Sequence, residues 1–149
     1  FLYEGSEAPL PLHDLRVDEL VSPVSAVPAV RRAVNRELRS IAATQDVVMV
    51  GRDIGTAVLP QAFLKIFIDA PPEIRARRRT IQLSHHGMPA DYDVVLANLL
   101  ARDVLDSTRE DSPLLCDSTY IWLDNSRDGS EAIVNRILEE YRRRITHAV

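Results

Sequence analysis

The sequence predicts an α/β fold with a parallel sheet, because short apolar runs alternate along the chain with stretches of helical spacing. Three runs have the composition of strands buried on both faces: Val47–Val50, Leu64–Ala70 and Tyr120–Asp124. With 149 residues, of which 46% are hydrophobic, the chain has the size of one globular domain with its own core.

The other elements are predicted from local signals. A short strand is expected over residues 1–5, followed by a turn and a loop that carries prolines. A helix is expected over residues 28–43, where proline suits the first turn and apolar residues recur at helical spacing. Further helices are expected over residues 71–83, 91–107 and 130–145, and an aspartate would cap the second of these three.

Composition narrows the function classes. The net charge of −4 argues against a generally basic nucleic-acid binder. No stretch reaches the roughly 18 apolar residues that a membrane span needs, and no signal-peptide pattern opens the chain. The single Cys116 excludes an internal disulfide, and no set of Cys and His has metal-ligand spacing. A cytoplasmic protein without a metal site of its own is expected.

The most informative stretch is the decapeptide Val47–Thr56, in which an apolar run leads directly into Gly-Arg-Asp-Ile-Gly-Thr. Ligands of open α/β sheets gather at the carboxyl ends of the strands, which is where Arg52 and Asp53 would lie. Arginine suits a phosphate because its planar fork makes two parallel charged hydrogen bonds. Lys65 is the only lysine, so phosphate contacts must come mainly from arginine. This stretch indicates a nucleotide site.

A second constellation lies in the predicted helix over residues 91–107. Arg102 and Asp106 are four residues apart and therefore neighbours on one face, and Arg109 follows a turn later. Alone, this pattern is more typical of a surface ion pair worth a few tenths of a kcal/mol. Together with Arg52 and Asp53, it favours a binding site.

These stretches together resemble the cytidylate kinases, a family of nucleoside monophosphate kinases with a P-loop fold. The resemblance runs through essentially the whole chain, and its most specific parts are Gly51–Thr56, Lys65–Ala70, Arg75–Arg79, Arg102–Leu114 and Leu123–Ser126. It implies a three-layer α/β/α P-loop NTPase-like parallel sheet that lacks the N-terminal P-loop strand and helix. Residues 1–43 would then belong to the CMP-binding region, and residues 44–149 would form the core domain with a lid over about 75–92.

The resemblance also implies which residues contact the nucleoside. Ser22, Arg31 and Asp53 are expected to recognise the cytosine base, and Arg102 and Asp106 to face the ribose. A pyrimidine is distinguished by a few fixed donors and acceptors, which a wrong base would leave unpaired.

The phosphate contacts implied by the resemblance are all arginines. Arg52 and Arg109 are expected to hold the α-phosphate of the acceptor, while Arg75, Arg78 and Arg79 belong to the mobile lid that closes over the phosphates. Phosphoryl transfer needs positive groups around a charge-spread phosphoryl, and a closing lid excludes water. Arg52, Arg78 and Arg109 are the expected catalytic residues. A solvated basic helix face is the alternative for each lid arginine.

The implied reaction transfers the γ-phosphoryl group of ATP, with Mg²⁺, to CMP or dCMP to give CDP or dCDP. It requires a loop of the form G-x-x-x-x-G-K-[ST], which these residues do not contain. The five glycines are scattered: Gly5, Gly51, Gly55, Gly87 and Gly129. We therefore expect the 149 residues to be inactive alone. There are two alternative functions: a kinase for another monophosphate, and a non-catalytic nucleotide-binding or assembly module.

In the family the P-loop strand is central and is flanked by the strands that match Val47–Val50 and Leu64–Ile68. Without it, two buried-type strands would keep unpaired backbone groups along their edges. Three situations are open: an N-terminal segment outside this sequence, a complementing chain, or direct pairing of the two strands. Because the acceptor-site residues are intact, the first two are favoured.

Overall fold

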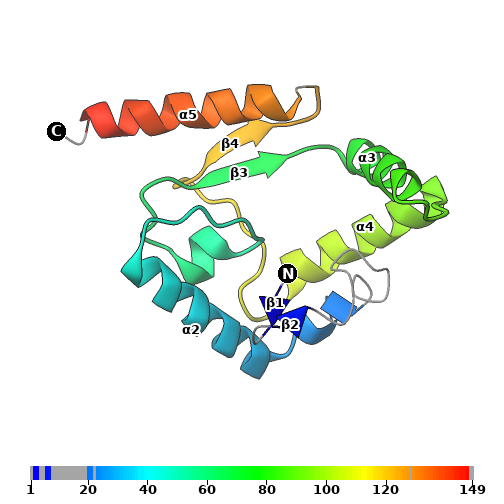
Figure 1. The fold of residues 1–149 in the computed structure, drawn as a ribbon, viewed down its shortest axis with the longest axis horizontal. Helices are drawn as coiled ribbons and strands as arrows, with labels where there is room; N and C mark the ends of the chain where they lie inside the picture. The colour runs from blue at the N-terminus through cyan, green and yellow to red at the C-terminus, as the bar shows by residue number, and fades with distance from the viewer. Residues whose placement is uncertain (1, 4–5, 8–19, 22, 128, 148–149) are drawn as a thin grey trace.

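The computed structural model describes residues 2–3, 6–7, 20–21, 23–127 and 129–147. Figure 1 shows a mixed α/β chain that is mostly helical. Its elements in chain order are β1 (Leu2–Tyr3), β2 (Ser6–Glu7), α2 (Pro28–Thr44), the π-helical turn η1 (Ile54–Val58), β3 (Ile66–Asp69), α3 (Pro72–His85), α4 (Tyr92–Thr108), β4 (Ile121–Asp124) and α5 (Ser130–His147). The predicted α/β class is confirmed at this level.

The helices begin and end where their local signals predict. Proline lies in the first turn of both α2 and α3. The Asp91 carboxylate caps α4 by accepting from the backbone N–H groups of Asp93 and Val94, at 2.9 and 3.1 Å. Helix α3 ends in a Schellman motif, in which Gly87 takes a φ of 71° and the Met88 N–H donates to the Leu83 carbonyl at 3.0 Å.

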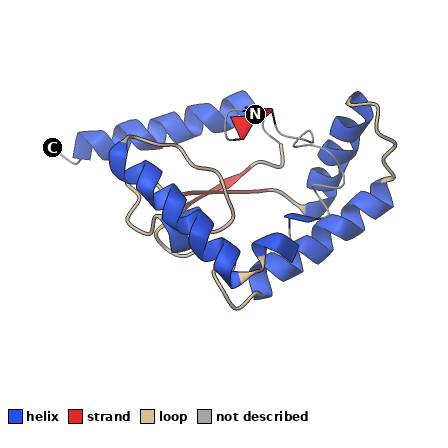
Figure 2. Ribbon diagram, turned by 60° about the horizontal axis from the view of Figure 1, so that its bottom comes forward, coloured by secondary structure: helices blue, strands red, loops and turns tan. Residues whose placement is uncertain are grey.

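The main sheet consists of two parallel strands. β3 pairs with β4 in the register Ile66↔Ile121 to Asp69↔Asp124. Helix α5 lies along β4 (Figure 1), and Figure 2 shows the two strands running between the helices. Leu123 of β4 and Ile133 of α5 are 3% and 4% exposed and belong to the core. At the N-terminus, β1 pairs with β2 in an antiparallel ladder, which confirms a strand at Leu2–Tyr3.

Val47–Val50 does not form the predicted strand. The segment has no strand partner among the described residues, and Val48 and Val50 are 98% and 96% exposed. The prediction was wrong because an apolar run becomes a strand only where a neighbouring strand satisfies its backbone groups. β3 pairs with β4 instead, so direct pairing of Val47–Val50 with β3 is also contradicted. The other edge of β3 has no strand neighbour in the described part of the chain.

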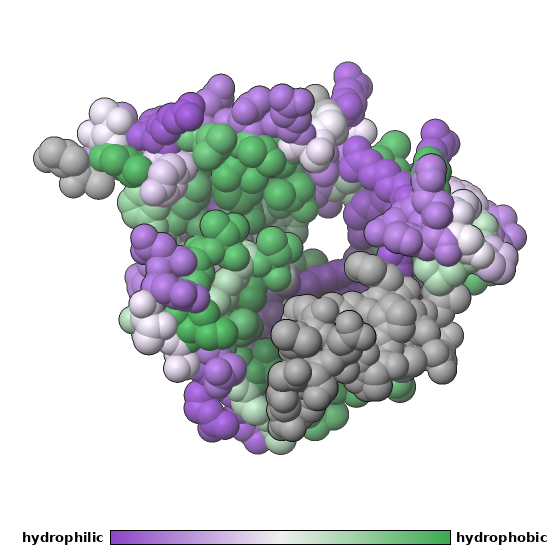
Figure 3. Space-filling view, in the orientation of Figure 1, coloured by the Kyte–Doolittle hydropathy of each residue, from purple (hydrophilic) through white to green (hydrophobic). Residues whose placement is uncertain are grey.

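A large apolar surface remains open to solvent. The buried hydrophobic residues in the described ranges are Val58, Ala70, Ala76, Leu83, Leu123 and Ile133. Many large apolar side chains stay exposed, among them Val48, Val50, Phe63 and Trp122. Figure 3 shows the apolar surface gathered on one side of a central opening. Apolar patches of such extent on a protein surface typically contact another segment or molecule.

Lys65, the only lysine of the chain, ties η1 to the start of the sheet. Its ammonium donates to the Gly55 carbonyl at 3.1 Å and lies 5.4 Å from the centre of the Tyr120 ring. Tyr120 in turn packs edge-on against Phe67, with ring centres 6.1 Å apart. Gly55 leaves room for this arrangement, since a Cβ atom there would lie 2.5 Å from the Tyr120 hydroxyl oxygen.

We therefore predict that Gly55→Ala displaces Tyr120 and Lys65 and destabilises the fold. The expected loss in the free energy of unfolding is about 1–3 kcal/mol, as for other overpacked sites. Urea unfolding followed by circular dichroism measures it. Gly129→Ala is the matched control, because nothing lies within 4 Å of a Cβ atom at Gly129. Equal stabilities of the two variants would contradict the packing argument.

Candidate nucleotide-binding site

Asp53 lies at the N-terminal end of the π-helical turn η1. Its backbone carbonyl accepts from the N–H groups of Ala57 and Val58, at 2.8 and 3.3 Å. Leu59 closes the turn by donating to the Ile54 carbonyl at 2.6 Å. Wide turns of this kind are rare and often occur at functional sites. Here the turn fixes the backbone position of Asp53.

The Asp53 carboxylate joins α2 to the end of α4. Arg31 of α2, only 7% exposed, donates to Asp53 and also to the Ser25 carbonyl, the latter at 3.3 Å. Arg109, which follows α4, lies 3.5 Å from the other Asp53 oxygen and 3.1 Å from Asp106 Oδ1. The structure therefore brings together three residues from three distant parts of the sequence.

Asp106 and Asp103 of α4 extend these contacts to Arg52. The Arg52 Nη1 atom lies 2.6 Å from Asp106 Oδ2 and 3.3 Å from Asp103 Oδ1. Arg102 Nε lies 3.8 Å from Asp106 Oδ2, which agrees with the predicted pairing four residues apart on one helix face. Asp106 is one of two buried charged residues among the described ones, and its contact to three arginines compensates its charge.

Asp103 was not identified from the sequence. It forms a bidentate pair with Arg75 of α3, with nitrogen–oxygen distances of 3.1 and 2.6 Å. Burial raises the pKa of the Asp103 carboxyl, but hydrogen bonds and charges from Arg75 and Arg52 outweigh it and lower the pKa below its usual value. The only sequence signal was its position between Arg102 and Asp106, which does not reveal a partner on another helix.

We call these eight residues the arginine–aspartate cluster: Arg31, Arg52, Asp53, Arg75, Arg102, Asp103, Asp106 and Arg109. Asp111 lies 4.0 Å from Arg31 Nε at the edge of the cluster, so four carboxylates face five arginines and one positive charge is in excess. In the described part of the chain, three of its buried guanidinium nitrogens make no hydrogen bond: Arg31 Nε, Arg102 Nε and Arg109 Nη2, which lie 4.0, 3.8 and 3.5 Å from the carboxylates of Asp111, Asp106 and Asp53. Buried donors of this kind normally have partners, so the cluster fits a ligand that carries negative charge and acceptor oxygens.

Three predicted site residues are not assigned to the cluster. Ser22 is not among the described residues. Arg78 is exposed on α3, and no contact joins it to the cluster in the ranges that the structure covers. Arg79, also on α3, donates to the Gln82 side chain at 2.9 Å.

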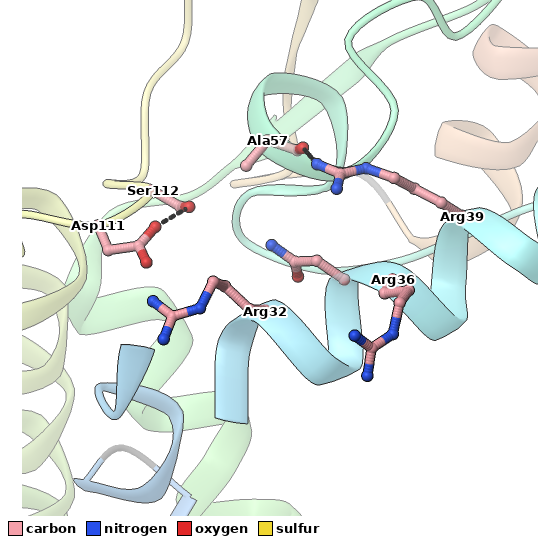
Figure 4. A pocket seen from close by; sticks show the side chains of 7 residues that line it. Arg32, Arg36, Arg39, Ala57, Asp111 and Ser112 are labelled. Carbon is pink, nitrogen blue, oxygen red and sulfur yellow. Dashed lines mark hydrogen bonds between the residues drawn. The ribbon is translucent and has the colours of Figure 1, made fainter. Parts of the chain in front are cut away.

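Two pockets share Asp111 and Ser112 in their lining, and one of them includes the cluster residue Arg109. The pocket that reaches the cluster, of about 500 Å³, is lined by Ala26, Pro28, Arg109, Glu110, Asp111 and Ser112. A second pocket, of about 570 Å³, lies between α2 and η1 and contains no predicted site residue. Figure 4 shows it: Arg39 is turned toward η1, where it donates to the Ala57 and Val58 carbonyls. The pocket beside Arg109 is thus the better candidate for a ligand.

Two other kinds of site have no support among the described residues. No group of three or more His, Cys, Asp or Glu side chains is placed to hold a metal ion. None of the helices there combines the length and the apolar character needed to cross a membrane.

The fold and the cluster together define a mixed α/β protein in which arginines from several elements gather with an excess of positive charge. The chain belongs to the cytidylate kinase family, whose sequence profile matches residues 1–143. Three relatives, each named cytidylate kinase, illustrate the similarity. The Parabacteroides distasonis protein is 42% identical over 90% of this chain, the Carboxydothermus hydrogenoformans protein 44% over 83%, and the Mycobacterium leprae protein 40% over 94%.

The match covers only part of the length of each relative. The chain covers 58%, 56% and 63% of the lengths of these three proteins, respectively. Family membership suggests a nucleoside monophosphate kinase and implies a P-loop NTPase fold.

Proposed function

We propose that this chain carries the acceptor half of a cytidylate kinase and binds CMP or dCMP at the arginine–aspartate cluster. Two observations support this: the arginines of the cluster outnumber the carboxylates around them, and three of its buried guanidinium nitrogens make no hydrogen bond in the described part of the chain. A phosphate monoester brings a charge of about −1.5 to −2 at pH 7 and three strong acceptor oxygens. The sign of the charge and the supply of donors therefore suit the phosphate of a nucleoside monophosphate.

Within the proposed site, Arg31 and Asp53 recognise the cytosine base together with Ser22. Arg31 is held by both Ser25 and Asp53, so its donors have a fixed direction. The Asp53 carboxylate is an acceptor, as the exocyclic amino group of cytosine requires. A uracil presents a carbonyl oxygen at that position and would face the carboxylate unfavourably.

Phosphate and ribose are assigned to the other side of the cluster. Arg52 and Arg109 hold the α-phosphate, whereas Arg102 and Asp106 face the ribose hydroxyls. The assignment is consistent with the contacts of Asp106 to both Arg52 and Arg109, since the ribose is joined to the phosphate. Arg78 and Arg79, in the proposed lid over about 75–92, would approach the phosphates only when the lid closes.

This sequence does not supply the part of the site that binds the phosphoryl donor. When bound, ATP with Mg²⁺ supplies the γ-phosphoryl group that the family transfers. The residues of this chain do not fit that group, because the sequence has no G-x-x-x-x-G-K-[ST] loop. No catalytic step is therefore assigned to ATP-binding residues of this chain.

We further propose that a P-loop segment, upstream in the protein or on a complementing chain, pairs between Val47–Val50 and β3. Two observations support this: the exposed Val48 and Val50 side chains and the edge of β3 without a strand neighbour in the described ranges. The added strand would complete a three-layer α/β/α core over residues 44–149. Residues 1–43 would remain in the CMP-binding region of a cytoplasmic enzyme.

Calorimetric titration of the chain with CMP, UMP and AMP tests the acceptor site. We predict that CMP binds at least tenfold more tightly than UMP or AMP, because uracil lacks the amino donor that Asp53 accepts and adenine, which has one, is a larger base than a pyrimidine site admits. Asp53→Asn should reduce this preference about tenfold, since it loses the charged acceptor. Arg143→Gln, which removes an exposed ion pair with Glu140 on α5, is the control and should bind like the wild type. Tighter binding of UMP than of CMP would refute the cytosine assignment.

A non-catalytic nucleotide-binding or assembly module is the second candidate, because the sequence lacks the phosphate-binding loop. Adding a segment that carries a G-x-x-x-x-G-K-[ST] loop separates the two candidates. The kinase proposal predicts CMP-dependent ATP consumption after this addition, and loss of that activity in Arg109→Gln. Nucleotide binding without any ATP consumption would favour the module.

A further inference from the structure

We propose that Asp103 is a positioning residue that couples helix α3 to the phosphate-binding edge of Arg52. The inference rests on the proposed function, in which Arg52 contacts the acceptor phosphate. In the proposed site, Asp103 itself contacts neither the substrate nor the reacting atoms. It acts through two arginines on different elements, which its carboxylate holds at once.

On one side, Asp103 anchors the first turns of α3. All three nitrogens of the Arg75 guanidinium donate hydrogen bonds. Nη1 and Nη2 donate to the Asp103 carboxylate, and Nε donates to the Ala70 carbonyl at 2.9 Å. The planar fork matches the carboxylate, which gives the pair directional preference as well as attraction. Arg75 thereby ties α3 to α4, against which it packs.

On the other side, Asp103 orients Arg52. Its contact and that of Asp106 both involve the same nitrogen, Nη1, at 3.3 and 2.6 Å. In the described part of the molecule, Nε and Nη2 of Arg52 have no protein partner. These two nitrogens form the edge that can bind two phosphate oxygens in parallel. Two carboxylates on the remaining nitrogen keep that edge pointed away from α4.

The side-chain exposures argue against a role in stability alone. Asp103, Arg52 and Arg75 are 28%, 31% and 30% exposed, respectively. Ion pairs that are open to water contribute little to folding. Their geometry, in contrast, decides how well Arg52 is prepared for a bidentate contact. Asp103 contacts both Arg52 and Arg75 of α3. A movement of Arg52 on phosphate binding would therefore also affect the position of α3, which begins the proposed lid.

The test compares CMP with cytidine, which lacks the phosphate, on the full chain and its variants. We expect Asp103→Asn to weaken CMP binding about tenfold in calorimetry and to change cytidine binding less than twofold. Asp103→Glu, which keeps the charge, should recover part of the loss. Asp93→Asn, an exposed aspartate in the first turn of α4, is the control and should bind both ligands normally. Equal losses for CMP and cytidine, or no loss for CMP, would overturn the inference.

A second measurement keeps this inference separate from the proposed function. If wild-type protein does not prefer CMP to cytidine, the proposed function fails, and the coupling is judged from unfolding free energies. Arg52→Gln and Arg75→Gln should be non-additive in the presence of Asp103 and additive in the Asp103→Asn background. Additivity in both backgrounds would overturn the coupling.

Discussion

The compensation of charge in the arginine–aspartate cluster is the constraint on which the rest of the structure depends. Arg31 and Asp106 are buried, and isolated buried charges are too costly to retain. Asp53 and Asp111 are the counter-charges of Arg31, and the arginines at positions 52, 102 and 109 are those of Asp106. Ion pairs thus join α2, the segment before η1 and α4 at one place, and the Arg75–Asp103 pair adds α3. Because the positive charges outnumber the negative ones, the cluster holds these elements together and still attracts an anion.

Local signals predicted much of the fold. The proline starts of α2 and α3 and the Asp91 cap of α4 are decided by neighbouring residues, so the sequence showed them directly. β3 and β4 were also predicted correctly, because the two apolar runs pair with each other within the chain. Val47–Val50 has equal strand character but no neighbour in the described ranges, and remains unpaired. Pairing is a property of the assembled sheet, which composition alone does not reveal.

The sequence predicted some residues of the candidate site and missed others. Arg52, Asp53, Arg102, Asp106 and Arg109 were proposed from motifs, and the structure gathers them in one cluster. Asp103 and Lys65 were missed, because each acts on a residue brought close only by folding. Their contacts show how the site is supported. Lys65 donates to the turn η1, which begins after Asp53, and Asp103 contacts Arg52. The roles of the cluster residues toward a nucleotide remain proposals.

The protonation of CMP itself tests the central claim most directly. Phosphorus NMR follows the second ionisation of the phosphate, which has a pKa of about 6 in free phosphate monoesters. If the uncompensated arginines of the cluster bind the phosphate, they favour its dianion, and the pKa of bound CMP should fall by about one unit or more. The shift should shrink in Arg109→Gln. A bound phosphate whose pKa is unchanged or raised would contradict the account.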